Sequence, residues 1–157
     1  MIGELTKDQI EHVLRSGLIG RIGCHDDNKV YVVPVTYVFD GKYIYAHSKE
    51  GQKVRMMRQN PKVCFEVDSL ETITNWRCVI VHGKFHEMKT VTEQEKASKI
   101  LNDRLSPYLL SETMRPQGFD QAPEQVNKDR KPVMYRIEIT EMTGRYEKNF
   151  YPGNLIK

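Results

Sequence analysis

The sequence predicts a mainly β fold, in which an antiparallel barrel carries helices at its periphery. Segments rich in β-branched and aromatic residues follow one another at hairpin spacing. Strands and helices do not alternate regularly, so a parallel sheet of βαβ units is not expected. At 157 residues the chain is long enough for one complete core, and we expect a single domain over 1–157.

A helix is expected to open the chain. Thr6 and Gln9 stand at capping-box spacing ahead of an apolar stripe, and Gly17 is expected to end the helix in a left-handed conformation. Two further helices are expected, over 51–59, ended by Asn60-Pro61, and from Thr92 onward. Strands are expected over 18–24, 29–39, 42–47, 62–69, 74–89 and 132–147, with a hairpin turn at Asp40-Gly41.

Several positions predict local features of these elements. Pro34 cannot donate to a ladder, so the second strand should be an edge or should kink there. Gly83 predicts a bulge in the long strand. Thr92 and Glu95 have the spacing of a second capping box. The polar, proline-containing stretch 106–131 is expected to be an excursion that includes one helical turn.

The composition argues against several classes of protein. The chain has 24 Lys and Arg against 21 Asp and Glu, and no dense basic stripe indicates nucleic-acid binding. No apolar stretch is long enough to cross a membrane. The three cysteines, Cys24, Cys64 and Cys78, are far apart, which favours buried free thiols in a cytoplasmic protein.

The segment 47–53 is the first candidate for chemistry. It leaves a strand at His47 and enters a short helix, so free backbone N–H groups, the Ser48 hydroxyl and the Lys49 and Lys53 ammonium groups gather at one turn. Such a turn suits a terminal phosphate. The alternative is that Ser48 only caps the helix and that the lysines are solvated. No Rossmann or P-loop motif is present.

Trp76-Arg77-Cys78 is the second candidate, because an aromatic ring beside a guanidinium can stack on a planar ligand. Packing of Trp76 on the core is an equally good interpretation. His82 and His86 share one face of an expected strand, but four residues of strand separate them by ~13 Å unless a bulge at Gly83 brings them closer. We therefore expect no metal site at these histidines.

Several weak motifs occur in an order that is fairly specific when taken together. They are GRIG at 20–23, VPVTY at 33–37, YAHS and GQK within 45–53, NPKVCFEV at 60–67, WRCVIVHGK at 76–84 and YRI at 135–137. In these motifs the chain, from about Thr6 to Gly144, resembles the pyridoxamine 5′-phosphate oxidase-like, FMN-binding split-barrel superfamily. Within it, the chain is most similar to the nitroimidazole-resistance-like flavin proteins.

The resemblance implies a split β-barrel that binds flavin mononucleotide (FMN). In such proteins two subunits build two equivalent sites, so a homodimer is implied. Carried over by motif, Ser48 and Lys53 would hold the FMN phosphate, with help from Arg21. His47 would stand beside the flavin ring as the catalytic residue.

The flavin ring would be lined from both subunits. One strand would line it, largely through backbone contacts, at Pro34, Val35, Thr36 and Tyr37. The partner would contribute Trp76, Arg77 and Cys78. Two departures from the family pattern matter: Cys78 stands where many relatives carry Ser or Gln, and no tryptophan follows Trp76. The missing C-terminal tryptophan argues against oxidation of vitamin B6.

The resulting hypothesis is an FMN-dependent oxidoreductase that passes electrons from a reduced donor, such as NADH or NADPH, to a small acceptor of the nitroimidazole type. His47 would donate a proton or a hydrogen bond, because histidine side chains titrate near neutrality. Two alternatives stay open. One is a non-catalytic module that stores or senses flavin. The other is a haem-handling split barrel in which His47 or His86 is an axial ligand.

Overall fold

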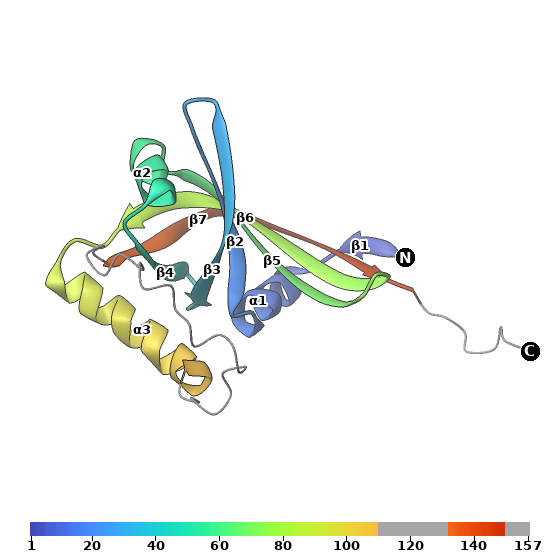
Figure 1. The fold of residues 1–157 in the computed structure, drawn as a ribbon. Helices are drawn as coiled ribbons and strands as arrows, with labels where there is room; N and C mark the ends of the chain where they lie inside the picture. The colour runs from blue at the N-terminus through green and yellow to red at the C-terminus, as the bar shows by residue number, and fades with distance from the viewer. Residues whose placement is uncertain (110–131, 150–157) are drawn as a thin grey trace, which may run out of the picture.

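Seven strands and three helices make up the part of the protein that the computed structural model describes, residues 1–109 and 132–149 (Figure 1). In chain order they are β1 (Ile2–Glu4), α1 (Lys7–Ser16), β2 (Ile19–Asp26), β3 (Lys29–Phe39), β4 (Tyr43–Lys49), α2 (Gln52–Gln59), β5 (Lys62–Thr72), β6 (Asn75–Glu87), α3 (Val91–Leu109) and β7 (Pro132–Lys148). In these ranges no helix has the length and apolar character needed to cross a lipid bilayer.

The strands form one antiparallel sheet that closes on itself. Its order is β1-β7-β4-β3-β2-β5-β6, and β6 also pairs with β7. The six strands from β2 to β7 therefore form a barrel, which confirms the predicted fold class. β1 is an additional strand at the end of β7, with Ile2 opposite Glu147. At three residues it is too short for a periodic pattern to predict it.

β3 changes partners part-way along its length. Residues 29–36 pair with β2, whereas only Tyr37, Val38 and Phe39 pair with β4. Beyond this short pairing the two strands separate, and the barrel is split there. Pro34 lies in the stretch that has β2 as its one strand neighbour, so the expectation of a local edge at this proline is confirmed.

Residues along each strand alternate between an inner and an outer face. The expected alternation of β5 is confirmed, because Val63, Phe65 and Val67 are buried and the residues between them are partly exposed. α1 adds Leu14 and its neighbours to the same core. α3 instead makes a second, smaller core on the outer face of β4, which consists of Tyr45, Met88, Ala97, Leu101 and Leu105.

The two ends of α1 differ in how well they were predicted. The Thr6 hydroxyl accepts from the Gln9 N–H at 3.3 Å and the Gln9 side chain accepts from the Thr6 N–H at 2.8 Å, which confirms the capping box. The left-handed conformation expected for Gly17 is wrong, since φ is -71° and ψ is 154°. Glycine is required here for close packing instead. A Cβ at Gly17 would overlap the Tyr37 hydroxyl, which donates to the Leu14 carbonyl at 2.7 Å.

The capping residue of α3 is Thr90, two residues before the expected Thr92. The Glu93 N–H donates to Thr90 Oγ1 at 3.2 Å, and the Thr90 N–H donates to Glu93 Oε2 at 3.4 Å. Thr92 and Glu95 have the same spacing, so the sequence offered two equivalent starts. Met88 packs against α3 directly after β6, which favours the earlier one. α3 also extends through residues 106–109, whereas the rest of the expected excursion lies outside the described residues.

β6 bends where the sequence predicts. Its pairing with β7 shifts register between His82 and Gly83, and a Cβ on Gly83 would come too close to the Glu138 carbonyl oxygen. The predicted hairpin turn is also confirmed. Gly41 has φ 98°, and the Asp40 carboxylate accepts from two backbone N–H groups at 2.8 and 2.7 Å.

Gly20→Ala tests the packing of β2 on β5. A Cβ at Gly20 would overlap the fully buried ring of Phe65 and would lie within 2.9 Å of the Glu66 carbonyl oxygen. Overpacking of this kind costs about 1–3 kcal/mol, so the melting temperature should fall by several degrees. Gly23→Ala is the matched control, because its Cβ would meet no atom closer than 3.6 Å. Equal melting temperatures for the two variants would contradict this packing.

Candidate functional site

The split between β3 and β4 brings together several of the expected binding residues. Past Ala46, β4 is paired only with β7 in the described part of the chain, and it leads through His47 and Ser48 into α2. Across the split, residues 29–36 of β3 pair only with β2. Backbone groups on the two facing edges therefore have no neighbouring strand, and they are available to a ligand.

Ser48 points into the barrel beside this split. Ser48 is 7% exposed, and its hydroxyl has no hydrogen-bond partner among the described residues. The same is true of the hydroxyl of Tyr135, which is fully buried. Burial raises the pKa of Tyr135 to about 12, while the Ser48 hydroxyl acts in the opposite direction. Two such hydroxyls on one face are unusual, because buried polar groups are normally hydrogen-bonded.

Lys53 brings positive charge to the start of α2. Its side chain is partly buried, and this burial lowers the pKa of its ammonium group. Among the described residues, no carboxylate acts on that pKa. The group that does act on the pKa of Lys53 is Cys24, and burial raises the pKa of the Cys24 thiol. A partly desolvated ammonium without a carboxylate partner is well suited to hold an anion.

Arg58 holds α2 in place. Its guanidinium binds both carboxylate oxygens of Glu87, each at 2.8 Å, and a Glu50 oxygen at 2.6 Å. Glu87 ends β6 and Glu50 lies between β4 and α2, so one side chain ties the helix to both sides of the turn. Hydrogen bonds, first to Glu87 and then to Glu50, raise the pKa of Arg58. Lys53 is thereby presented from a fixed helix.

The four residues expected along the flavin ring alternate between the two faces of β3. Pro34 and Thr36 are exposed on the outer face, whereas Val35 and Tyr37 are buried in the core. The hydrogen bond of Tyr37 to the Leu14 carbonyl holds its side chain inside. This arrangement suits contacts through the backbone, and it limits side-chain contacts on the outer face to Pro34 and Thr36.

His47 is exposed on the outer face of β4, opposite Met134 of β7. Ser48 is the next residue and points inward. The structure therefore does not place the His47 imidazole and the Ser48 hydroxyl on the same side of the strand. A ligand that contacts both side chains has to cross the open edge of β4.

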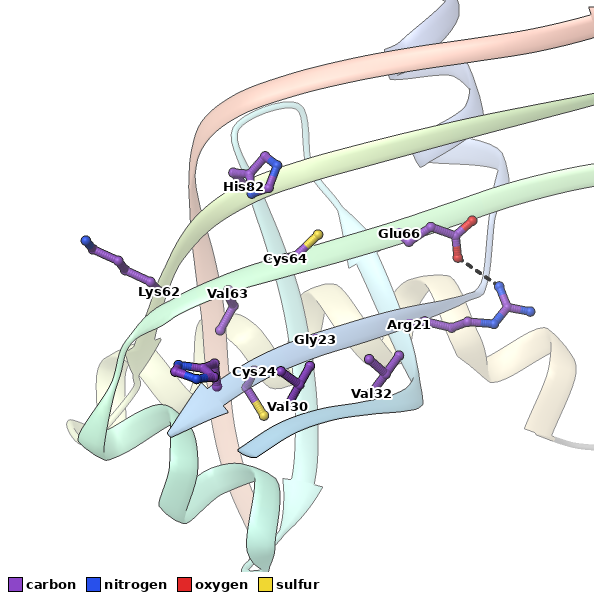
Figure 2. A pocket seen from close by; sticks show the side chains of 11 residues that line it. Arg21, Gly23, Cys24, Val30, Val32, Lys62, Val63, Cys64, Glu66 and His82 are labelled. Carbon is purple, nitrogen blue, oxygen red and sulfur yellow. Dashed lines mark hydrogen bonds and ion pairs between the residues drawn. The ribbon is translucent and has the colours of Figure 1, made fainter. Parts of the chain in front are cut away.

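A hollow of about 510 Å³ lies on the outer face of β2, β3, β5 and β6 (Figure 2). Its lining is mostly apolar and includes Val30 and Val32, which are 71% and 59% exposed. Of the expected binding residues, only Arg21 lines it. The hollow is thus a separate feature from the turn that carries Ser48 and Lys53.

Arg21 is already paired with two carboxylates. Its guanidinium lies 2.9 Å from Glu66 and 3.2 Å from Asp68, and the hydrogen bond to Glu66 is the main cause of its raised pKa. This pairing does not favour a role for Arg21 in holding a phosphate. Cys78 donates to Glu66 at 3.4 Å, and burial, reinforced by Glu66, raises the pKa of Cys78 to about 12. Cys78 is therefore a protonated thiol at neutral pH.

Trp76 and Arg77, as neighbours on β6, point to opposite faces. The Trp76 indole N–H donates to Glu147 at 3.0 Å, and the ring is partly buried. Arg77 lies 3.7 Å from Glu71 and lines a small hollow beside α1. Trp76 shares its face with Cys78. These two side chains can approach one ligand together, and that of Arg77 does not join them.

Tyr135 and Arg58 are site residues that the sequence did not point out. Tyr135 stood in a strand motif, and no spacing in the chain reveals that β4 and β7 are neighbours. Arg58 lies in the last turn of α2, where basic residues are common. Its partners Glu50 and Glu87 follow no pattern that would have singled them out.

Residues 6–146 match the family model described as pyridoxamine 5′-phosphate oxidase. Because this match spans most of the chain, the protein belongs to the pyridoxamine 5′-phosphate oxidase family. The superfamily resemblance and the split-barrel fold expected from the sequence motifs are thereby confirmed.

Three similar proteins illustrate the relationship. An uncharacterized protein of Rhizobium meliloti (strain 1021) is 27% identical over 145 residues, which are 90% of this chain and 92% of that protein. The crystal structure of an FAD-binding protein from Mesorhizobium loti is 27% identical, with a TM-score of 0.74 over 94% of this chain and 99% of its own. A proposed 5-nitroimidazole antibiotic resistance protein from Bacteroides thetaiotaomicron is 17% identical, with a TM-score of 0.67 over 93% of this chain and 87% of its own.

Lys53→Met should stabilise the ligand-free protein in a pH-dependent way. Because burial lowers the pKa of Lys53, the folded state is penalised wherever this lysine is charged. The gain in unfolding free energy should be complete below the lowered pKa of Lys53 and should shrink as the pH rises through it toward the ordinary lysine value of 10.5. Urea unfolding of the wild type and of Lys53→Met across this pH range measures the gain. Lys49→Met, at an exposed lysine, is the control, and a pH-independent gain would contradict the assignment.

Proposed function

We propose that the protein binds FMN at the split of the barrel and passes electrons to a small acceptor of the nitroimidazole type. Membership of the pyridoxamine 5′-phosphate oxidase family supports flavin binding, as does the likeness to an FAD-binding protein of Mesorhizobium loti. The observation that carries the proposal is the buried, unpartnered Ser48 hydroxyl at the same turn as the Lys53 ammonium group.

The residues of this turn fit the phosphate of FMN. A phosphate brings negative charge and several acceptor oxygens. The turn offers a hydroxyl from Ser48, an ammonium group from Lys53 and the free N–H groups of the first turn of α2. A terminal phosphate can be enclosed from several sides, so the burial of Ser48 favours FMN over FAD.

The isoalloxazine ring would lie along the edge of β3 that faces the split. Backbone groups near Pro34 and Thr36 would bind its polar edge, since this stretch has a strand neighbour on one side only. Such contacts orient a planar ring without requiring particular side chains. This agrees with the burial of Val35 and Tyr37 inside the barrel.

A homodimer would complete the site. The outer-face hollow and the exposed side chains of Ile19, Val30 and Val32 form an apolar surface that a second copy would cover. The second copy would also bring Trp76 and Cys78 toward the ring. The Cys78 thiol, protonated at neutral pH, would donate a hydrogen bond there.

When bound, FMN supplies the electron transfer, and the protein orients the ring, excludes water and handles protons. A ring N–H of His47, on the outer face of β4, would donate a proton to the acceptor. NADH or NADPH would be the reduced donor. All three cysteines lie in the described part and are free, which supports a reducing, cytoplasmic setting.

His47→Ala tests this function in the FMN-loaded protein. We expect the variant to keep its flavin, because His47 is exposed and points away from Ser48. Turnover of a nitroimidazole with NADPH should fall by about 100-fold, the usual size of a proton-transfer contribution. His12→Ala, at an exposed histidine of α1, is the control and should turn over like the wild type.

Three results would overturn the proposal in different ways. A colourless protein that stays colourless in FMN would exclude the cofactor. Bound flavin that NADH and NADPH do not bleach, or that no acceptor reoxidises, would indicate a storage or sensing module instead. A Soret band in place of the two flavin bands would indicate a haem protein.

A further inference from the structure

The interior of the barrel holds a pair of hydroxyls whose hydrogen bonding is incomplete. In the pairing of β4 with β7, Ala46 lies opposite Tyr135 and Ser48 lies opposite Val133. Ser48 and Tyr135 are therefore diagonal neighbours on the inner face of adjacent strands. An aromatic side chain can span such a diagonal.

The surroundings of Tyr135 leave it few other partners. The residue is fully buried, and its ring centroid lies 5.2 Å from that of Phe85. The nearby Cys24 thiol already donates to the Tyr31 carbonyl at 3.7 Å. The Ser48 hydroxyl lowers the pKa of Tyr135, which places it near the phenol, but neither oxygen has a hydrogen-bond partner among the described residues.

The chemistry of hydroxyl groups decides the direction of a hydrogen bond between the two. Each hydroxyl has one proton to donate and can accept from two donors. If Ser48 donated to Tyr135, the phenol proton would lack an acceptor, and the serine proton would no longer be available to an anion. If Tyr135 donates to Ser48 Oγ, the serine proton stays free to reach an anion at the turn.

We propose that Tyr135 is a positioning residue of the phosphate site, donating its phenol proton to Ser48 Oγ so that the Ser48 hydroxyl donates to a phosphate oxygen. This inference rests on the proposed function and extends it to a residue on β7. It also explains why a polar group lies among the apolar residues of the barrel, since a buried hydroxyl without a partner costs about 1–3 kcal/mol.

The inference predicts how Tyr135→Phe and Ser48→Ala act on the binding of FMN and riboflavin, which lacks the phosphate. Tyr135→Phe should weaken FMN binding by up to about tenfold, the size of one hydrogen bond between neutral groups, and should leave riboflavin binding unchanged. Ser48→Ala should weaken FMN binding at least as much. The double variant should bind FMN like Ser48→Ala alone, because Tyr135 acts through Ser48.

Fluorescence titration of the full-length protein measures these affinities. Unchanged riboflavin binding shows that Tyr135→Phe is folded, since the substitution keeps the ring that packs on Phe85. Tyr45→Phe is the matched control, because Tyr45 is equally buried but belongs to the small core under α3. It should change neither affinity.

The outcomes separate this inference from the proposed function. Wild-type protein that binds FMN and riboflavin equally would overturn the phosphate site itself. If the wild type prefers FMN, two results would overturn the role of Tyr135 alone. One is unchanged FMN affinity in Tyr135→Phe, and the other is an additive loss in the double variant, which would mean that the two hydroxyls act independently.

Discussion

The site depends on the way β3 is divided between two neighbours. β2 pairs with residues 29–36 and β4 pairs only with Tyr37, Val38 and Phe39, so the barrel is closed at one end of β3 and open at the other. Pro34 is compatible with this opening, because proline is tolerated where a ladder hydrogen bond is absent. The opening offers strand edges that stay rigid through their other neighbours. A flat ligand with polar edges can therefore bind backbone groups whose positions are fixed before it arrives.

The polar groups at the split are costly for the fold and useful for a ligand. Among the described residues, the buried side-chain atoms without a hydrogen-bond partner are Ser48 Oγ, Tyr135 Oη and Arg136 Nε, and the first two belong to diagonal neighbours on the inner face of β4 and β7. Lys53 adds an ammonium group whose pKa is lowered by burial. The salt bridges of Arg58 to Glu50 and Glu87 hold the helix that carries this lysine. The salt bridges around the anion site thus offset part of the stability that its unpartnered polar groups and its buried ammonium group cost the fold.

Local chemistry made much of the fold predictable from the sequence, and long-range pairing limited what could be predicted of the site. The Thr6 cap, the Asp40-Gly41 turn and the Gly83 bulge depend on residues close together in the chain. The start of α3 was misplaced because two capping boxes overlap, and Gly17 was misjudged because packing on Tyr37, not its own backbone, requires glycine. Ser48 and Lys53 stood out through their shared turn. The partners that give Arg21, Tyr135 and Arg58 their surroundings come from other strands, which no spacing along the chain reveals.

The central claim is that the turn from His47 to Lys53 holds a phosphate, and the wild-type protein alone can test it. Isothermal titration with FMN and with riboflavin, at the same salt concentration, isolates the contribution of the phosphate, because the two ligands share the same ring. The account predicts that FMN binds at least about 100-fold more tightly, as expected for charge-assisted hydrogen bonds to a partly buried anion. Equal affinities for the two ligands, or no binding of FMN, would contradict it.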